Sequence, residues 1–359
     1  MHTRVKFVNK DKSVFFQVLR ERVDADFREQ NLTRCGGKPI LGKSVVLLGL
    51  LLGCYALVLS DLLTGWPLLG VAVLLGVATA GVGMSVMHDA NHGSFSSTPW
   101  INAVSGASLY LLGGNVLNWK VQHNTLHHTY TNIHDMDEDI TGKYFLRLCP
   151  TEKRKGYHRF QHIYAFFLYG LMTFSFFVKD FRQAIKYHRL AGKGPVKPFT
   201  GAELLVLFSS KVVYVLLVAV LPLWLTSLTF GQWLLGFVVM HFTAGLILSI
   251  VFQLAHIVEG AHQPMPDAQG SIPNAWAIHQ LETTANFGCP RWLSWYIGGL
   301  DYQVEHHLFP SISHIHYRRL SKIVRQTAEE FRIPYNRKPT FGRALQSHYQ
   351  MLRSLGTAA

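Results

Sequence analysis

The chain has 359 residues, of which 49% are hydrophobic and 15% charged, and its formal net charge at pH 7 is +13. The apolar residues are concentrated in blocks almost free of charge, which argues against a soluble enzyme and for a membrane protein. The basic residues flank these blocks and form no nucleic-acid-binding motif, so we expect lipid contact and no nucleic-acid partner. The four cysteines are widely separated, which predicts neither a disulfide framework nor an iron–sulfur cluster.

Four membrane-spanning helices are predicted, in two pairs. The first apolar block covers residues 45–87 and the second covers residues 204–255, and each is interrupted once by a short polar turn. Because about 20 apolar residues suffice to cross the hydrocarbon layer as a helix, each block holds two crossings. The predicted spans are residues 45–63, 67–87, 204–226 and 232–255, with approximate ends.

The distribution of basic residues predicts the orientation of these spans. Lysine and arginine lie before, between and after the two apolar blocks, whereas the two short turns carry none. By the positive-inside rule the basic segments and both termini are cytoplasmic. We therefore expect an all-α integral membrane protein with two transmembrane hairpins and a cytoplasmic helical cap. Residues 1–43 would form a cytoplasmic segment without a signal peptide, residues 44–320 the membrane domain, and residues 321–359 a basic cytoplasmic tail.

Three further segments are predicted to be helical outside the spans. Residues 13–30 place Phe15, Leu19 and Val23 at helical spacing, which predicts an amphipathic helix that could lie on the membrane surface. The segments 101–119 and 164–178 are apolar, but one is rich in turn residues and the other is short. We expect interfacial or re-entrant helices there rather than further crossings.

Histidine is unusually frequent, with 19 residues, and eight of them stand in groups just beyond the predicted spans. Residues four apart on a helix share a face, so His88 with His92, and His123 with His127, each direct two imidazoles toward one point. The same spacing recurs near the third basic segment, and one more histidine ends the fourth span. The remaining histidines of the eight are His128, His256, His306 and His307, and Gln303 begins the group that contains the last two.

The histidine groups predict a metal centre at one face of the membrane. Imidazole binds zinc, copper, iron and nickel, and eight histidines exceed the needs of one tetrahedral ion, so two ions are the natural number. The sequence contains no HExxH motif of the zinc proteases. A site with open coordination positions suits iron used for oxygen chemistry, although the donor type alone leaves the other metals open.

The order of these motifs resembles the histidine boxes of the membrane fatty acid desaturase family. The resemblance covers about residues 40–320. It is carried by His88-x3-His92, His123-x3-His127-His128, Gln303-x2-His306-His307 and Gln253-x2-His256. In that family the histidines bind two non-haem irons. The resemblance therefore implies the catalytic ligand set His88, His92, His123, His127, His128, His256, His306 and His307.

The third motif begins with Gln303, where many desaturases and hydroxylases have a histidine. In this it resembles the front-end desaturases, which insert a double bond between an existing one and the carboxyl end of an acyl chain. The resemblance implies a cis-desaturated acyl-CoA or acyl-lipid product, O2 as co-substrate, and a bacterial plasma membrane location. Front-end relatives often carry a fused cytochrome b5 with an HPGG motif, which residues 1–43 lack. A separate ferredoxin or cytochrome b5 is therefore the expected electron donor.

Polar residues near the motifs are candidates for orienting metal-bound imidazoles, because such ligands usually donate their second ring N–H to a carboxylate or carbonyl. Ordinary solvation of these side chains is an equal alternative. An amide could also bind weakly through its oxygen or hydrogen-bond a metal-bound water. The candidates are Gln303, Gln253, Asp89, Asp139, Asp301 and Glu305.

Another histidine pair is assigned to lipid rather than to metal. His158 and His162 have helical spacing but lie among four basic residues at positions 153–159, a setting that suits lipid head groups better than a further cation.

Two other functions are alternatives to desaturation. A hydroxylase or ketolase of the same superfamily would act on a lipid, alkane or carotenoid, but Gln303 favours desaturation. A membrane metal carrier or sensor would also need clustered histidines. It would require a polar path across the bilayer, for which the spans offer little. The polar residues in or beside the spans are Asp61, Glu203, Lys211 and His241.

Overall fold

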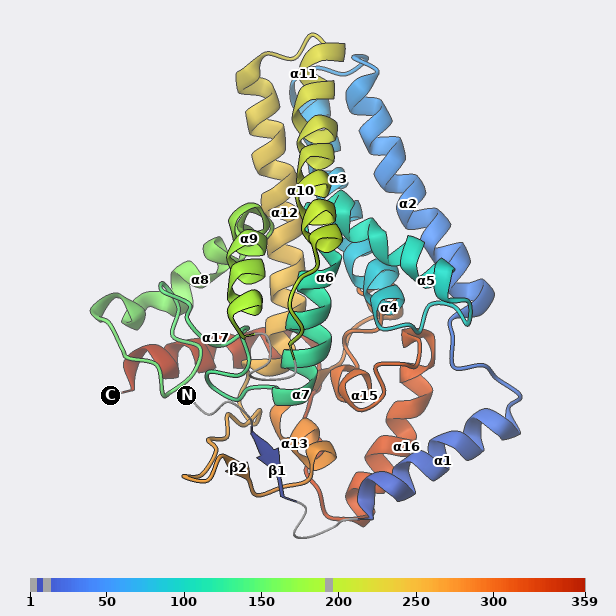
Figure 1. The fold of residues 1–359 in the computed structure, drawn as a ribbon, viewed down its shortest axis with the longest axis vertical. Helices are drawn as coiled ribbons and strands as arrows, with labels where there is room; N and C mark the ends of the chain where they lie inside the picture. The colour runs from blue at the N-terminus through green and yellow to red at the C-terminus, as the bar shows by residue number, and fades with distance from the viewer. Residues whose placement is uncertain (1–4, 9–13, 191–195, 359) are drawn as a thin grey trace. The chain divides into compact units, whose positions relative to one another are not determined.

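The computed structural model describes residues 5–8, 14–190 and 196–358, which fold into helices joined by loops, with four strands of two residues each (Figure 1). The chain divides into two compact units, each assembled from segments distant in the sequence. The first unit comprises Met1–Gly36, Val121–Ala165 and Val251–Ala359. The second comprises Gly37–Lys120 and Phe166–Ile250. The expectation of a helical protein is confirmed.

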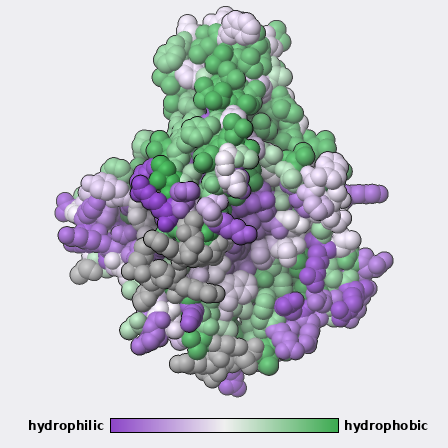
Figure 2. Space-filling model, in the orientation of Figure 1, coloured by the Kyte–Doolittle hydropathy of each residue, from purple (hydrophilic) through white to green (hydrophobic). Residues whose placement is uncertain are grey.

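The second unit holds the helices that are long and apolar enough to cross a membrane. Four such helices are found among the described residues, as the sequence predicted. They run alongside one another in Figure 1, and hydrophobic residues dominate the surface over them in Figure 2. They are α2 (Gly37–Leu59); α3 (Gly65–Val82) continued by η1 (Gly83–Met87) and α4 (His88–Asn91); α10 (Gly201–Val215) continued by η5 (Leu216–Val220) and α11 (Leu221–Leu225); and α12 (Phe230–His256).

The first of these helices, α2, begins and ends earlier than the predicted span at residues 45–63. The helix starts at Gly37 and includes Lys38 and Lys43, because helical backbone hydrogen bonds do not require apolar side chains. The chain leaves the helix before Asp61, which has a left-handed φ of 56°. The Asp61 carboxylate accepts hydrogen bonds from the Ser227 backbone N–H (3.0 Å) and hydroxyl (2.9 Å). The two polar turns of the second unit are thereby joined.

The two shorter apolar segments are both broken. The segment 164–178 crosses from α8 (Gln161–Gly170) to α9 (Met172–Leu190), two helices that meet at a bend of 77°. The segment 101–119 is divided among α5 (Pro99–Gly106), η2 (Ala107–Leu112) and α6 (Val116–Trp119). Neither segment forms one straight helix, and the expectation of interfacial or re-entrant helices there remains a prediction.

Polar side chains inside the second unit are buried and paired. Lys211 of α10 forms an ion pair with Asp180 of α9 and also donates to the backbone carbonyls of Gly113 and Phe176. His241 of α12 lies 2.9 Å from the Tyr214 hydroxyl and 2.9 Å from the Thr173 hydroxyl. These contacts attach α9 to α10 and α12.

The first unit is built around a helix pair and two short sheets. In α1 (Phe15–Glu29), the apolar face is buried against α16 (Tyr317–Glu330). This face is covered by protein rather than by the membrane surface suggested above; Ser13 lies outside the described residues. The strands β1 (Lys6–Phe7) with β2 (Ser271–Ile272), and β3 (Asn286–Phe287) with β4 (Arg337–Lys338), pair in parallel. The other elements are η3 (Lys120–His127), α7 (His128–Tyr130), η4 (Gly156–Phe160), α13 (Trp276–Thr283), α14 (Arg291–Tyr296), α15 (Gln303–Leu308), η6 (His314–His316) and α17 (Phe341–Thr357).

Candidate metal centre

The second histidine motif lies on a π-helical segment. The segment η3 has the i to i+5 hydrogen bonding of a π-helix and leads directly into α7. In this geometry residues five apart come together, and π turns are rare and frequently lie at functional sites. His123 Nε2 accordingly lies 3.2 Å from His128 Nε2, five residues later. The predicted i, i+4 partners His123 and His127 also lie close, with ring centroids 5.4 Å apart.

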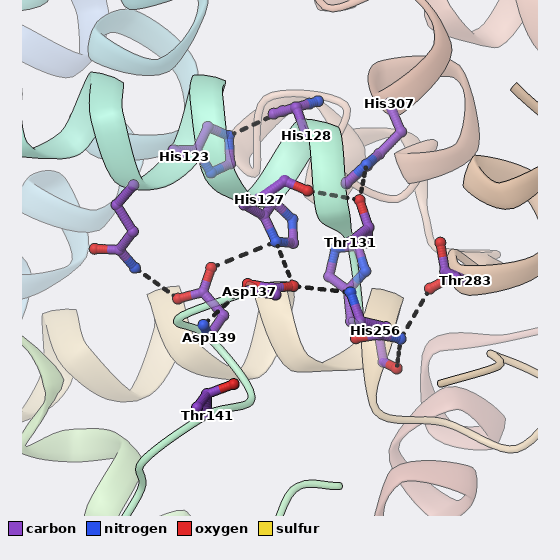
Figure 3. A network of polar contacts seen from close by, with 12 residues as sticks. His123, His127, His128, Thr131, Asp137, Asp139, Thr141, His256, Thr283 and His307 are labelled. Carbon is purple, nitrogen blue, oxygen red and sulfur yellow. Dashed lines mark hydrogen bonds and ion pairs between the residues drawn. The ribbon is translucent and has the colours of Figure 1, made fainter. Parts of the chain in front are cut away.

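Three imidazoles from three distant segments converge in the first unit. His127 comes from η3, His256 from the end of α12, and His307 from α15 (Figure 3). One ring nitrogen from each lies within 4.8 Å of the other two, and all three residues are buried. This cluster can hold a metal ion.

The hydrogen-bonding state of these rings fits metal ligation. Among the residues that the structure describes, no hydrogen-bond partner reaches His127 Nε2 or either ring nitrogen of His256. Buried polar atoms almost always have a partner, because leaving one unsatisfied costs about 1–3 kcal/mol. An ion accepting the lone pairs of neutral imidazoles would remove that cost.

A pair of carboxylates fixes the ring of His127. Its Nδ1 lies 3.0 Å from Asp137 and 3.5 Å from Asp139 (Figure 3). Burial lowers the pKa of His127, but the two carboxylates outweigh it and the pKa is raised overall. Gln122 in turn donates to Asp139 at 2.7 Å. With Nδ1 held as the donor, Nε2 is left to face the cluster, as expected for an oriented metal ligand.

Replacement of Asp137 by asparagine will weaken metal binding about 10- to 100-fold, the usual effect of removing a carboxylate behind a ligating imidazole. Metal content after dialysis against a graded series of chelator concentrations measures this. Asp135→Asn is the matched control, because Asp135 lies in the same loop and its side chain is 55% exposed. Equal metal retention in D137N and wild type would contradict the assignment.

Asn132 ties the second motif to the end of α12. It adopts a left-handed φ of 58°, which asparagine tolerates better than most residues. Its amide nitrogen lies within hydrogen-bonding distance of three backbone carbonyls, His256 at 2.9 Å, Thr283 at 3.1 Å and His262 at 3.2 Å. Its own backbone N–H donates to Asp137 at 2.9 Å. Asn132 thus sets the position of His256 through its side chain and that of the carboxylate behind His127 through its backbone N–H.

The third motif is held by hydrogen bonds on the far side of each ring. His307 Nδ1 lies 2.9 Å from the Gln280 amide oxygen and 3.3 Å from the Thr131 hydroxyl. His306 Nδ1 lies 3.1 Å from the Tyr317 hydroxyl. Both rings therefore have Nδ1 engaged, as His127 does.

The first motif lies in the second unit. The π turn η1 ends directly before His88, and the rings of His88 and His92 have centroids 4.7 Å apart. Both pack edge-on against Trp119, with centroid distances of 5.7 Å and 5.5 Å. The predicted pairing of these two imidazoles on one helix face is present, and a second π turn stands beside a histidine motif.

The other candidates for orienting the ligands have varied surroundings. Asp89 lies 3.9 Å from His88 Nδ1. Asp301 accepts a hydrogen bond from Ser294 at 2.7 Å, away from the imidazoles named above. Gln303 is buried, and the Gln253 side-chain oxygen is buried with no hydrogen-bond partner among the described residues.

Glu305 lies between Gln303 and His306 but points into a separate polar network. It accepts hydrogen bonds from Asn286 (2.7 Å) and Tyr335 (2.9 Å), so strand β3 and the segment before β4 hold the backbone of α15. Burial raises the pKa of Glu305 to about 7. Glu305 therefore supports the third motif through Asn286 and Tyr335 rather than by hydrogen-bonding an imidazole ring.

Several residues that position the cluster were absent from the sequence-based candidates. They are Asp137, Asn132, Thr131, Gln280 and Tyr317. An Asn or Thr directly after the second motif carries no spacing signal of its own, and Gln280 and Tyr317 are brought in by folding. The acidic turn at residues 137–139 was the one available signal.

The structure thus has apolar helices long enough to cross a membrane and a buried cluster of imidazoles able to hold a metal ion, features compatible with a membrane-bound metalloenzyme. A family model described as fatty acid desaturase matches residues 64–339, well over half of the chain. The chain belongs to the fatty acid desaturase family. The resemblance inferred from the histidine motifs is thereby confirmed, and the protein is an oxidoreductase that desaturates fatty acyl chains.

Relatives of known activity match nearly the whole chain. The sn-1 linoleoyl-lipid 6-desaturase of Synechocystis is 38% identical over 99% of this chain and 99% of the relative. The sn-1 linoleoyl-lipid 6-desaturase of Arthrospira platensis is 32% identical over 96% and 93%. The acyl-lipid (8-3)-desaturase of Physcomitrium patens is 33% identical over 98% and 74%. These relatives are front-end desaturases, the group suggested by Gln303.

Proposed function

We propose that the protein is a front-end acyl-lipid desaturase that inserts a cis double bond on the carboxyl side of an existing one, as in linoleoyl chains. The match to a linoleoyl-lipid 6-desaturase along 99% of both chains carries this proposal. The glutamine that opens the third motif supports it. The relatives named here are all desaturases, which favours desaturation over hydroxylation, ketolation or metal transport.

The proposed cofactor is a pair of non-haem irons. The convergence of His127, His256 and His307 supports a site of this kind, as do the buried His127 Nε2 and His256 ring nitrogens, which have no hydrogen-bond partner among the described residues. We assign the complete ligand set to the eight histidines of the motifs, so that His88 and His92 bind with the others. Gln303 and Gln253 are proposed to hydrogen-bond a metal-bound water. The eight are His88, His92, His123, His127, His128, His256, His306 and His307.

The reaction removes two hydrogens from adjacent methylenes and consumes O2, two electrons and two protons, giving a double bond and two waters. A bound pair of irons supplies the oxidant for this step. The protein's part is to hold the ligands. Asp137 and Asp139 keep His127 Nδ1 engaged, Gln280 does so for His307, and Tyr317 for His306. Because each ring is fixed from behind, its Nε2 atom is preorganised for metal binding.

The proposed topology is two transmembrane hairpins with the metal centre, the helical cap and both termini on the cytoplasmic side of a bacterial plasma membrane. The distribution of lysine and arginine supports this orientation. The division at residues 43–44 and 320–321 remains part of the same proposal. We further propose a separate ferredoxin or cytochrome b5 as the donor, attracted by the net charge of +13.

Expression in a host supplied with linoleate tests the function. We expect a new cis double bond between the existing bonds and the carboxyl end, located by mass spectrometry of the isolated lipids. The same analysis, separated by lipid class, shows whether the product is first seen on intact lipid or on acyl-CoA. A hydroxylated product without a new double bond would reject the proposal.

A further inference from the structure

A surface of the first unit combines exposed apolar side chains with clustered cations. It comprises residues 144–163, from the loop before η4 to the first turn of α8, and is called here the 144–163 surface. Four of its large apolar side chains point outward, with exposed fractions of 65% for Tyr144, 58% for Phe145, 48% for Phe160 and 64% for Ile163. Large exposed apolar residues gathered in one place usually mark a contact with a partner or a membrane.

The cations of this surface lie directly on its aromatic rings. The Lys155 ammonium is 3.4 Å from the centroid of the Tyr144 ring, and the Arg159 guanidinium is 4.5 Å from that of Phe160. Lys153 and Arg154 are exposed beside them. Residues 151–163 contain four basic side chains and a single acid.

The single acid and the two histidines are already engaged within the fold. Glu152 accepts from the Gly142 N–H at 2.8 Å and lies 3.3 Å from His134. His158 Nδ1 accepts from the Lys155 N–H at 3.1 Å, and the ring of His162 packs against Tyr349, with centroids 5.0 Å apart. The histidine pair therefore has structural contacts and the positive charge of the surface is not cancelled from within it.

We propose that the 144–163 surface lies in the membrane interface and binds the head groups of anionic phospholipids. Tyrosine is enriched at the head-group level, and interfacial segments combine phenylalanine, which buries at the acyl boundary, with lysine and arginine, which meet phosphate. An acidic protein would pair with the cations but would leave Phe145 and Ile163 without apolar cover.

The first test measures lipid affinity and not catalysis, so its failure is separate from failure of the proposed function. Purified protein in detergent is titrated with phosphatidylglycerol or phosphatidylcholine, and bound lipids are counted by native mass spectrometry. We expect preferential retention of phosphatidylglycerol. K155Q/R159Q should lower that affinity about 25-fold, since each cation near an anionic surface contributes about fivefold. K322Q/R325Q, with the same charge change on exposed positions of α16, should not change it.

The second test measures how deeply position 163 lies in the membrane. A nitroxide is placed on I163C, or on Q326C of α16, with the partly exposed Cys35 and Cys289 replaced by serine. In liposomes the label at position 163 should be more accessible to O2 than to a water-soluble nickel relaxant, and the label at position 326 the reverse. A water-exposed label at 163 would overturn the proposal. So would a K155Q/R159Q variant that binds acidic ferredoxin more weakly while its phosphatidylglycerol affinity is unchanged.

Discussion

Replacing His127 by alanine will abolish double-bond formation while the protein remains in the membrane fraction. His127 is buried, faces His256 and His307, and is the only one of these three whose second nitrogen is held by carboxylates among the described residues. Its loss removes a ligand and also leaves Asp137 without the imidazole that offsets its buried charge. Product yield by mass spectrometry and iron per polypeptide by elemental analysis should both fall, the product below detection.

His162→Ala is the matched control for this experiment. His162 is also a histidine at helical spacing in the first unit, but its ring packs against Tyr349 rather than another imidazole. We expect the control to retain iron and full product yield. Full activity in His127→Ala would show that the eight-histidine ligand set is wrong. Loss of both variants from the membrane fraction would indicate a folding effect. In that case His306→Ala provides an independent test of the ligand set.

The contacts between histidines near one another in this centre's sequence motifs could be predicted, whereas the contacts between residues distant in sequence could not. Histidines four apart on a helix are recognisable because the helical period brings them to one face, and His88 with His92 illustrates this. The contact between His123 and His128 was not foreseen, since it depends on a π turn that adds one residue to the period. No composition or spacing rule used here distinguishes a π turn from an α-helix.

The positioning residues could not be found from spacing for a related reason. Asn132 acts through three carbonyls that are 124, 130 and 151 residues away in sequence, and Asp137 reaches His127 because the chain reverses at Asn132. Asp139, chosen for its nearness to the motif, lies farther from His127 Nδ1 than Asp137 does, at 3.5 Å against 3.0 Å. Closeness in sequence therefore indicated the correct turn but not the stronger partner.

The helices able to cross a membrane were easier to predict from the sequence, because a run of apolar residues is itself the physical requirement for crossing the bilayer. Their ends were less certain, as α2 shows by extending to Gly37 through lysines that hydropathy would exclude. The partners of intramembrane polar residues could not be found from hydropathy, because they come from other helices. The structure supplies those partners for His241 through Tyr214 and Thr173.

Replacing Lys211 by methionine will destabilise the protein by about 3–5 kcal/mol, the usual cost of removing one partner from a buried ion pair. The change leaves the buried Asp180 carboxylate without its cation and removes the donor to two backbone carbonyls, Gly113 and Phe176. The measurement is the free energy of unfolding by sodium dodecyl sulfate in mixed micelles, followed by circular dichroism.

The double variant K211M/D180N separates the loss of charge pairing from a mere change of packing at Lys211. It has no uncompensated charge, so we expect it to recover most of the stability lost in K211M, because a buried pair replaced on both sides by neutral groups is often close to neutral in energy. D180N alone should be destabilised like K211M, since it leaves Lys211 buried without a carboxylate. If K211M matched wild type, or if the double variant were as unstable as the sum of the two single ones, the ion pair would not be what holds α9 against α10.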